Sequence, residues 1–180
     1  MAEVFLRRLT RWQAETQRES VADLHAAAHH GPPAADGVPD RAEFLRRFAG
    51  YDIQRPGFDM VIGSDPALVG CCYGYAADRE GDWLRACSAG LPDELPDEVR
   101  QAAAAGRLFL LAGLMVLPAH RRTGVATRLA QTLLIRSNDA LALAPVAADN
   151  ALARAAFRSW GWRPPAGAGA RLEPWTRPLP

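Results

Sequence analysis

The alternation of apolar and polar residues is clearest in the middle of the chain. A nine-residue run, Leu108–Val116, is apolar except at Gly113. It is too short to span a membrane and has the length of a buried strand. Pro118 cannot donate to a sheet ladder, so we expect the strand to end near Leu117. Beyond it, apolar residues recur at helical spacing and predict an amphipathic helix with the inner positions Val125, Ala126, Leu129, Ala130, Leu133 and Leu134.

The same pattern predicts strands and helices along the rest of the chain. Further strands are expected at Glu3–Leu9, Phe58–Ile62, Leu68–Ala76, Leu141–Val146 and Arg171–Trp175, with a return strand starting at Trp162. Helices are expected at Arg11–His29, with Trp12 facing inward, at Arg41–Tyr51, for about ten residues from Pro96, and after Asn150. A loop is expected at Gly31–Val38. This mixture predicts an α/β fold, and we find no repeat or linker that would divide residues 1–180 into two domains.

Composition excludes several classes of partner. Hydrophobic residues make up 49% of the chain and charged residues 23%, as in ordinary globular proteins. The net charge of +1 provides no strong field that would attract nucleic acid or a membrane. The three cysteines, Cys71, Cys72 and Cys87, do not suggest a disulfide framework. The first ten residues lack a long apolar run, so we expect no signal peptide and a cytoplasmic location. The sequence allows a monomer or a homodimer.

The turn between the central strand and the amphipathic helix carries the best candidate chemistry. Its sequence is Arg121-Arg122-Thr123-Gly124-Val125-Ala126. The first amides of a helix have no partner within the helix, and the helix dipole is positive at that end. Gly124 allows a close approach of the backbone to a ligand, and the arginines add positive charge. The turn therefore predicts a cradle for pyrophosphate, although it has neither a Walker motif nor a dinucleotide fingerprint.

Two motifs resemble those of the GNAT family of N-acetyltransferases. Arg121, Gly124 and Ala126 fill the pattern Arg/Gln-x-x-Gly-x-Gly/Ala, known in that family as motif A, and Val116-Leu117-Pro118 matches the V-x-P that often precedes it. Downstream, residues 150–162 resemble motif B, N-x-x-A-x-x-x-Y-x-x-x-G-F. Asn150, Ala153 and Gly161 match this second pattern, Phe157 stands where the family usually has Tyr, and Trp162 where it usually has Phe.

The resemblance implies a GNAT fold, with a mixed central sheet of six or seven strands flanked by helices and with splayed fourth and fifth strands. It also implies acetyl-CoA as a co-substrate and an amine as the acceptor. Pantetheine would lie along the fourth strand, and Gly113 suggests a bulge there. The residues that the resemblance assigns to cofactor binding are Leu114, Met115, Val116, Arg121, Arg122, Thr123, Gly124, Val125, Ala126, Thr127, Asn150 and Phe157.

The catalytic residues are less clear from the sequence. Many relatives use a carboxylate on the fourth strand, but Leu108–Val116 has none. The remaining candidates for a general base or acid are Tyr73, Tyr75, Glu80, Asp82 and His120, or a chain of water molecules. A non-catalytic module that binds acyl-CoA is the alternative to an acetyltransferase. It draws support from Phe157, which has no proton to give, and from the missing carboxylate.

Two further features have a structural and a functional interpretation. The acidic segment Asp78–Ala105 is either a solvated insertion or a lid that attracts a cationic amine. His25 and His29 are four residues apart and can share a helical face, but no third ligand lies near them in the sequence. We therefore expect no metal site.

Overall fold

The computed structural model describes residues 3–29, 40–87, 90–167 and 169–180, and the loop expected at Gly31–Val38 lies outside them. Six strands form one mixed sheet in chain order, flanked by helices. The strands are β1 (Phe5–Leu9), β2 (Asp59–Asp65), β3 (Ala67–Ala76), β4 (Leu108–Val116), β5 (Leu141–Ala147) and β6 (Leu172–Pro178). The α-helices are α1 (Arg11–Thr16), α2 (Arg18–Ala28), α3 (Arg41–Gly50), α4 (Asp82–Cys87), α5 (Asp97–Ala104), α6 (Val125–Leu134) and α7 (Ala151–Ser159).

The chain divides into two structural units. Unit 1 consists of residues 1–74 and 113–136, and unit 2 of residues 75–112 and 137–180. Strands β3 and β4 run through both units, because the boundaries fall within them.

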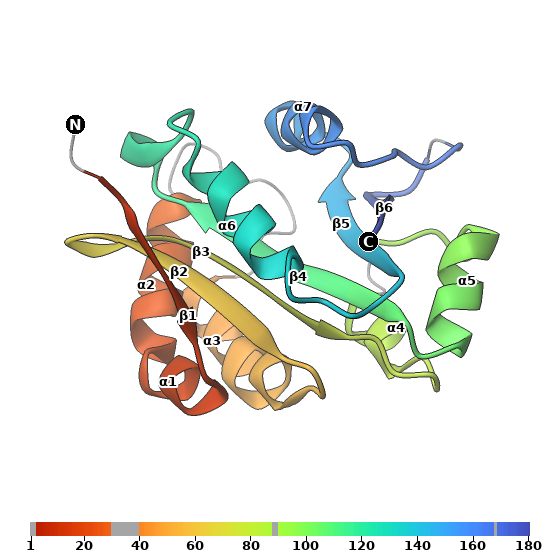
Figure 1. The fold of residues 1–180 in the computed structure, drawn as a ribbon, viewed down its shortest axis with the longest axis horizontal. Helices are drawn as coiled ribbons and strands as arrows, with labels where there is room; N and C mark the ends of the chain where they lie inside the picture. Colours follow the sequence, from red (N-terminus) through yellow and green to blue (C-terminus); the bar gives the residue numbers. More distant parts are fainter. Residues whose placement is uncertain (1–2, 30–39, 88–89, 168) are drawn as a thin grey trace. The chain divides into compact units, whose positions relative to one another are not determined.

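In unit 1, helices cover both faces of the sheet (Figure 1). A side chain at Gly70 of β3 would meet Leu129 of α6, whereas the ring of Tyr73 contacts Phe48 of α3. Positions 70 and 73 point to opposite faces, because successive side chains of a strand alternate. Helices α6 and α3 therefore cover opposite faces of β3.

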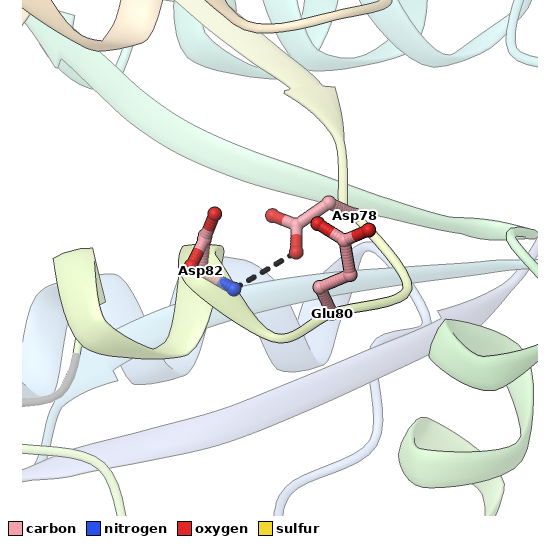
Figure 2. Close-up of side chains that lie close together, drawn as sticks. All are labelled: Asp78, Glu80 and Asp82. Carbon is pink, nitrogen blue, oxygen red and sulfur yellow. Dashed lines mark hydrogen bonds between the residues drawn. The ribbon is translucent and has the colours of Figure 1, made fainter.

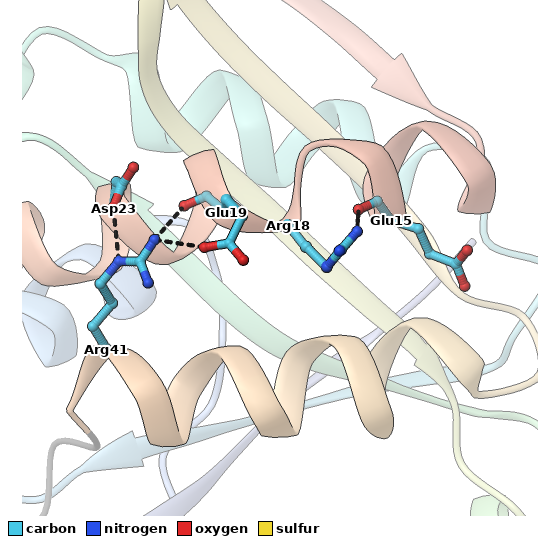
Figure 3. Close-up of polar contacts among 5 residues, drawn as sticks. All are labelled: Glu15, Arg18, Glu19, Asp23 and Arg41. Carbon is cyan, nitrogen blue, oxygen red and sulfur yellow. Dashed lines mark hydrogen bonds and ion pairs between the residues drawn. The ribbon is translucent and has the colours of Figure 1, made fainter.

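Two helices of unit 1 are joined by one arginine. Arg41, the first residue of α3, donates to the carboxylates of Glu19 and Asp23 on α2, each over 2.7 Å (Figure 3). These hydrogen bonds raise the pKa of the Arg41 guanidinium above its ordinary value. On the same side of α2, Arg18 donates to the carbonyl of Glu15. Because the Arg41 pairs are exposed, we expect them to set the register of α3 on α2 more than to stabilise the fold.

In unit 2, β5 pairs antiparallel with β6, and β4 pairs parallel with β5 at Leu108–Leu110. Trp175 of β6 contacts Phe157 of α7, whereas the neighbouring Thr176 donates to Glu98 of α5. Adjacent strand residues point to opposite faces, so α7 and α5 cover opposite faces of β6.

The structure confirms the α/β fold and changes several element boundaries. The helix expected at Arg11–His29 is interrupted at Gln17, and Trp12, expected to face inward, is 72% exposed. Strand β2 extends to Asp65, beyond the predicted end at Ile62, because a register shift at Gly63 and Ser64 lets pairing with β3 continue.

The C-terminal elements also differ from the prediction. The return strand expected at Trp162 is a single bridge between Arg163 and Thr176. Strand β6 continues through Pro174 to Pro178, although the sequence predicts that prolines end it near Trp175. The sheet thus has six strands among the described residues.

Candidate functional site

The predicted cofactor turn connects β4 to α6 in unit 1. Strand β4 ends at Val116, and one turn of 3₁₀ helix, Pro118–His120, leads into residues 121–124. Gly124 is the N-cap of α6 with φ of 83°, a left-handed conformation that favours glycine. Arg122 also has a positive φ, 61°, and no other non-glycine residue of the described ranges does. Two left-handed residues therefore bend the backbone where the sequence predicts a ligand.

The backbone amides of this turn are available to an anion. No side chain caps α6 at Gly124. Among the described residues, no hydrogen bond is donated by the amides of residues 122–126. A Cβ at Gly124 would have no heavy atom within 4 Å, so the approach to these amides is open on that side. Five unpartnered amides at the positive end of a helix dipole form an arrangement that suits a phosphate group.

The two arginines of the turn differ in their contacts. Arg121 donates through Nε to the carbonyl of Val116 over 3.1 Å, and through its terminal nitrogen to the carbonyl of Ala28 at the end of α2. In the part of the chain that the structure describes, the Arg122 side chain has no hydrogen bond or ion pair. The motif specifies Arg121 and leaves position 122 free, but only the structure shows that the Arg121 side chain is held by carbonyls of the fold.

The strand residues expected to bind pantetheine lie at the C-terminal end of β4. Met115 and Val116 are buried and Leu114 is half-buried. A Cβ at Gly70 of β3 would lie 3.0 Å from the carbonyl oxygen of Met115, so β3 needs glycine at this close approach. The parallel pairing of β4 with β5 covers three residues of each strand, and both strands continue beyond it.

The two downstream residues expected at the cofactor belong to unit 2. The side chain of Asn150 accepts a hydrogen bond from the amide of Ala153 over 3.0 Å and thereby caps α7, as its sequence position predicts. Phe157 is 6% exposed and contacts Trp160, Trp162 and Trp175. These contacts assign both residues a role in the fold of unit 2, and their contact with a cofactor stays a prediction.

The catalytic candidates are distributed over both units. Tyr73 lies in unit 1, is 3% exposed, and packs between Phe48 and Phe58 with its ring against Gly113 of β4. Tyr75 lies in unit 2 and is fully buried. The ring of Tyr73 thus lies against the strand expected to bind pantetheine. The close approach of its ring gives a reason for glycine at position 113, and the bulge expected there stays a prediction.

Glu80 and Asp82 lie in unit 2, where they form an acidic cluster with Asp78 (Figure 2). One carboxylate oxygen of each residue lies within 4.8 Å of the others. Asp78 accepts from the amides of Asp82 and Trp83 over 2.8 and 3.1 Å, and thereby caps the short helix α4. Asp82 accepts from Arg85. These contacts account for Asp78 as a helix cap and for Asp82 as one half of an ion pair, and the expectation that no metal binds stays a prediction.

One polar pair beside the turn was not predicted from the sequence. His120 Nε2 lies 3.3 Å from a carboxylate oxygen of Asp65, the last residue of β2. The carbonyl of His120 accepts from the Thr123 hydroxyl over 2.6 Å. Residues 65 and 120 are far apart in the sequence, so no spacing pattern reveals this contact. It joins the β2–β3 hairpin to the cofactor turn.

A comparison with protein-family models decides the family. The model described as "Acetyltransferase (GNAT) family" matches residues 18–162, which include the whole turn and the downstream motif. The chain belongs to the GNAT family of acetyltransferases. The resemblance inferred from the two motifs is therefore confirmed.

Solved structures show the same GNAT fold at low sequence identity. A phosphinothricin acetyltransferase of Sinorhizobium meliloti, solved with acetyl-CoA, is 16% identical, with 99% of this chain and 89% of that chain covered and a TM-score of 0.61. A GNAT-family acetyltransferase of Staphylococcus aureus is 10% identical, with 99% of this chain and 100% of that chain covered and a TM-score of 0.67. An acetyltransferase of Thermus thermophilus is 16% identical, with 98% of this chain and 97% of that chain covered and a TM-score of 0.60.

No curated protein sequence matches this chain. No helix of the described residues is both long enough and apolar enough to span a membrane.

Proposed function

We propose that this protein transfers the acetyl group of acetyl-CoA to a primary amine of a small molecule, peptide or protein. The observation that carries the proposal is the turn after β4, where the amides of residues 122–126 have no partner among the described residues. Membership of the GNAT family supports acetyl transfer in general. The acetyl-CoA bound to the phosphinothricin acetyltransferase supports the identity of the acetyl donor.

The residues of this chain support the binding of acetyl-CoA more directly than they support a particular general base or acid for acetyl transfer. We infer that the amides of residues 122–126 hold the pyrophosphate, and that backbone groups of Leu114–Val116 hold pantetheine as an added strand. Thr127 follows these amides in the first turn of α6. The net positive charge of Arg121 and Arg122 favours the same anion. Asn150 and Phe157 complete the proposed set of cofactor-binding residues.

The reaction requires one proton to leave the amine and one to reach the departing sulfur. The amine nitrogen attacks the thioester carbonyl, the C–N bond forms, the C–S bond breaks, and the thiolate of CoA leaves. A free thiol has a pKa of about 8.5, so this thiolate is a tolerable leaving group near neutral pH without a dedicated acid. Among the proposed acid–base residues, Tyr73 has its ring against Gly113 of the proposed pantetheine strand. Tyr75, Glu80 and Asp82 belong to unit 2.

Replacement of Gly124 tests the cofactor site. Gly124→Glu places a carboxylate where phosphate and backbone should meet, and we expect the affinity for CoA to fall at least tenfold, about 1.4 kcal/mol, in calorimetry. Gly124→Ala separates the backbone effect from the charge. Gly57→Glu is the matched control, because Gly57 also has a positive φ, 69°, and is exposed in unit 1. Unchanged affinity in a folded Gly124→Glu variant would refute the assignment.

Turnover separates the enzyme from the alternative of a non-catalytic module that binds acyl-CoA. Release of free thiol from acetyl-CoA should depend on the amine in a panel of primary amines. Tight CoA binding without amine-dependent thiol release would favour the non-catalytic module. Competition between CoA and ATP tests whether the turn is specific for CoA.

The remaining expectations complete the proposal. We infer that residues 1–180 form a single GNAT domain, because the family match runs through residues of both units. A cytoplasmic location and a monomeric or homodimeric state also belong to the proposal.

A further inference from the structure

We propose that the two adjacent arginines of the cofactor turn have different roles. Arg121 is a positioning residue that couples the turn to the C-terminal end of α2, whereas Arg122 supplies the charge that meets a phosphate of the ligand. This inference rests on the proposed function, because it assumes that the turn binds CoA. All residues that carry it belong to unit 1.

The contacts of Arg121 join the ends of two elements that are far apart in the sequence. Its Nε donates to the carbonyl of Val116, the last residue of β4. Its terminal nitrogen donates to the carbonyl of Ala28, the last residue of α2. The last carbonyls of a helix have no partner within the helix and lie at the negative end of its dipole. A guanidinium is therefore a favourable partner for the end of α2.

An arginine is needed for both contacts at once. The guanidinium is planar and presents five N–H donors in a fixed fork, so one side chain can serve two carbonyls in different directions. A lysine at the same position keeps the charge but has a compact ammonium without that fork. Lysine therefore separates the effect of geometry from the effect of charge.

Arg122 shows the opposite behaviour. Its side chain is exposed and makes no hydrogen bond or ion pair with any described residue. Its backbone has φ of 61°, a left-handed conformation that is unfavourable for a non-glycine residue. Such strain persists where neighbouring contacts impose it. Arg121 is anchored on one side, and on the other the Thr123 hydroxyl donates to the carbonyl of His120.

These contacts predict a coupling between the ligand and α2. The anchored side chain of Arg121 holds the strained turn in place, and the turn presents its amides. A ligand that binds those amides stabilises the turn and, through Arg121, the end of α2. Thermodynamic linkage is reciprocal. The factor by which the ligand stabilises the end of α2 is therefore the factor by which loosening that end lowers the affinity for the ligand.

Four variants test the two roles by their CoA affinity in the full-length protein. The affinity for CoA should fall about tenfold in both Arg121→Lys and Arg121→Ala, because each variant lacks the guanidinium fork that bridges Val116 and Ala28. Arg122→Ala should lose a similar factor, but Arg122→Lys should keep most of the affinity, since only charge is needed there. Wild-type affinity in Arg121→Lys, or an equal loss in Arg122→Lys and Arg122→Ala, would overturn the division of roles.

Hydrogen exchange tests the coupling itself. The amide of His29 donates to the carbonyl of His25 and reports on the last turn of α2. Saturating CoA should slow exchange at residues 27–29 at least about threefold in the wild type and in Arg122→Ala, but not in Arg121→Lys. No change in the wild type with CoA bound would overturn the coupling.

The two proposals fail in different ways. If the wild type binds no CoA, the proposed function is wrong and the coupling to a ligand is wrong with it. The anchoring by Arg121 is then tested in the protein without ligand. The amides of residues 27–29 should exchange faster in Arg121→Ala than in Arg122→Ala. Equal exchange in these two variants would refute the positioning role of Arg121.

Discussion

The ring of Tyr73 on β3 occupies the space that a side chain at Gly113 of β4 would need. A Cβ at position 113 would lie 2.3 Å from Cε1 of Tyr73, 2.5 Å from Cζ and 2.8 Å from the phenol oxygen. These separations are too short for any carbon, so β4 accepts only glycine at this point unless the ring moves.

Gly113→Ala should therefore destabilise the protein by overpacking, by about 1–3 kcal/mol in urea unfolding. Gly50→Ala is the control, because Gly50 ends α3 and a Cβ there meets no heavy atom within 4 Å. The control should be neutral or stabilise by up to about 1 kcal/mol. Equal changes in unfolding free energy for the two substitutions would show that the ring of Tyr73 moves aside without destabilising the protein.

Phe157 should contribute strongly to the stability of unit 2. Its buried ring contacts Trp160, Trp162 and Trp175, with ring centroids 5.2, 5.1 and 6.4 Å away. Phe157→Ala leaves a cavity among these rings and should cost about 3–5 kcal/mol in chemical unfolding. Leu152→Ala on the same helix is the control, since Leu152 is 73% exposed and should change stability by less than about 0.5 kcal/mol. A small effect at Phe157 would mean that the ring does not belong to the core.

The two buried thiols of β3 should make the protein less stable in alkali. Burial raises the pKa of Cys71 from its ordinary 9.0 to about 12 and raises that of Cys72 well above 9.0. Between pH 9 and about 12 the unfolded chain loses thiol protons that the folded chain keeps. The free energy of unfolding should therefore fall as pH rises, by up to about 1.4 kcal/mol per pH unit for each thiol. The curve of unfolding free energy against pH should be flatter in the double variant Cys71→Ala, Cys72→Ala. Parallel curves for the variant and the wild type would contradict the raised pKa values of the two thiols.

Native thiol accessibility gives an independent check of the same burial. Cys71 and Cys72 are both inaccessible to solvent. At pH 8 a thiol reagent should modify neither residue in the folded protein and both in urea. Rapid modification of either one without denaturant would show that β3 opens.

The sequence is most informative where local chemistry decides the structure. Thr10 and Asn150 are helix N-caps as their residue types predict, because a side-chain oxygen next to the first turn satisfies its amides. Strand β4 begins at Leu108 as predicted and ends at Val116, one residue before the expected end near Leu117, since a buried apolar run stops where proline follows. The cofactor turn was found for the same local reason, because the glycine and the arginines are adjacent in the chain.

The features that were missed depend on contacts between distant residues. The bond from Arg121 to Ala28 spans 93 positions and the pair of His120 with Asp65 spans 55, so no periodicity encodes either one. The sequence also does not show that the ring of Tyr73 lies against Gly113, so this reason for glycine depends on the folded structure. Prolines after Trp175 are expected to end the last strand, yet β6 continues to Pro178, which pairs with Leu141 of β5. Tertiary pairing overrides local preference at these positions.

The interleaved order of the two units has a consequence for synthesis on the ribosome. Unit 1 receives residues 1–74 first and residues 113–136 only after residues 75–112 have been made. At 5–20 residues per second, translation of this intervening stretch takes about 2–8 s. During that delay β3 lacks the Leu129 side chain of α6, which covers it at Gly70 in the finished fold. The nascent chain should therefore expose an apolar sheet face to chaperones until α6 emerges, and arrest of translation before residue 136 should prolong that exposure.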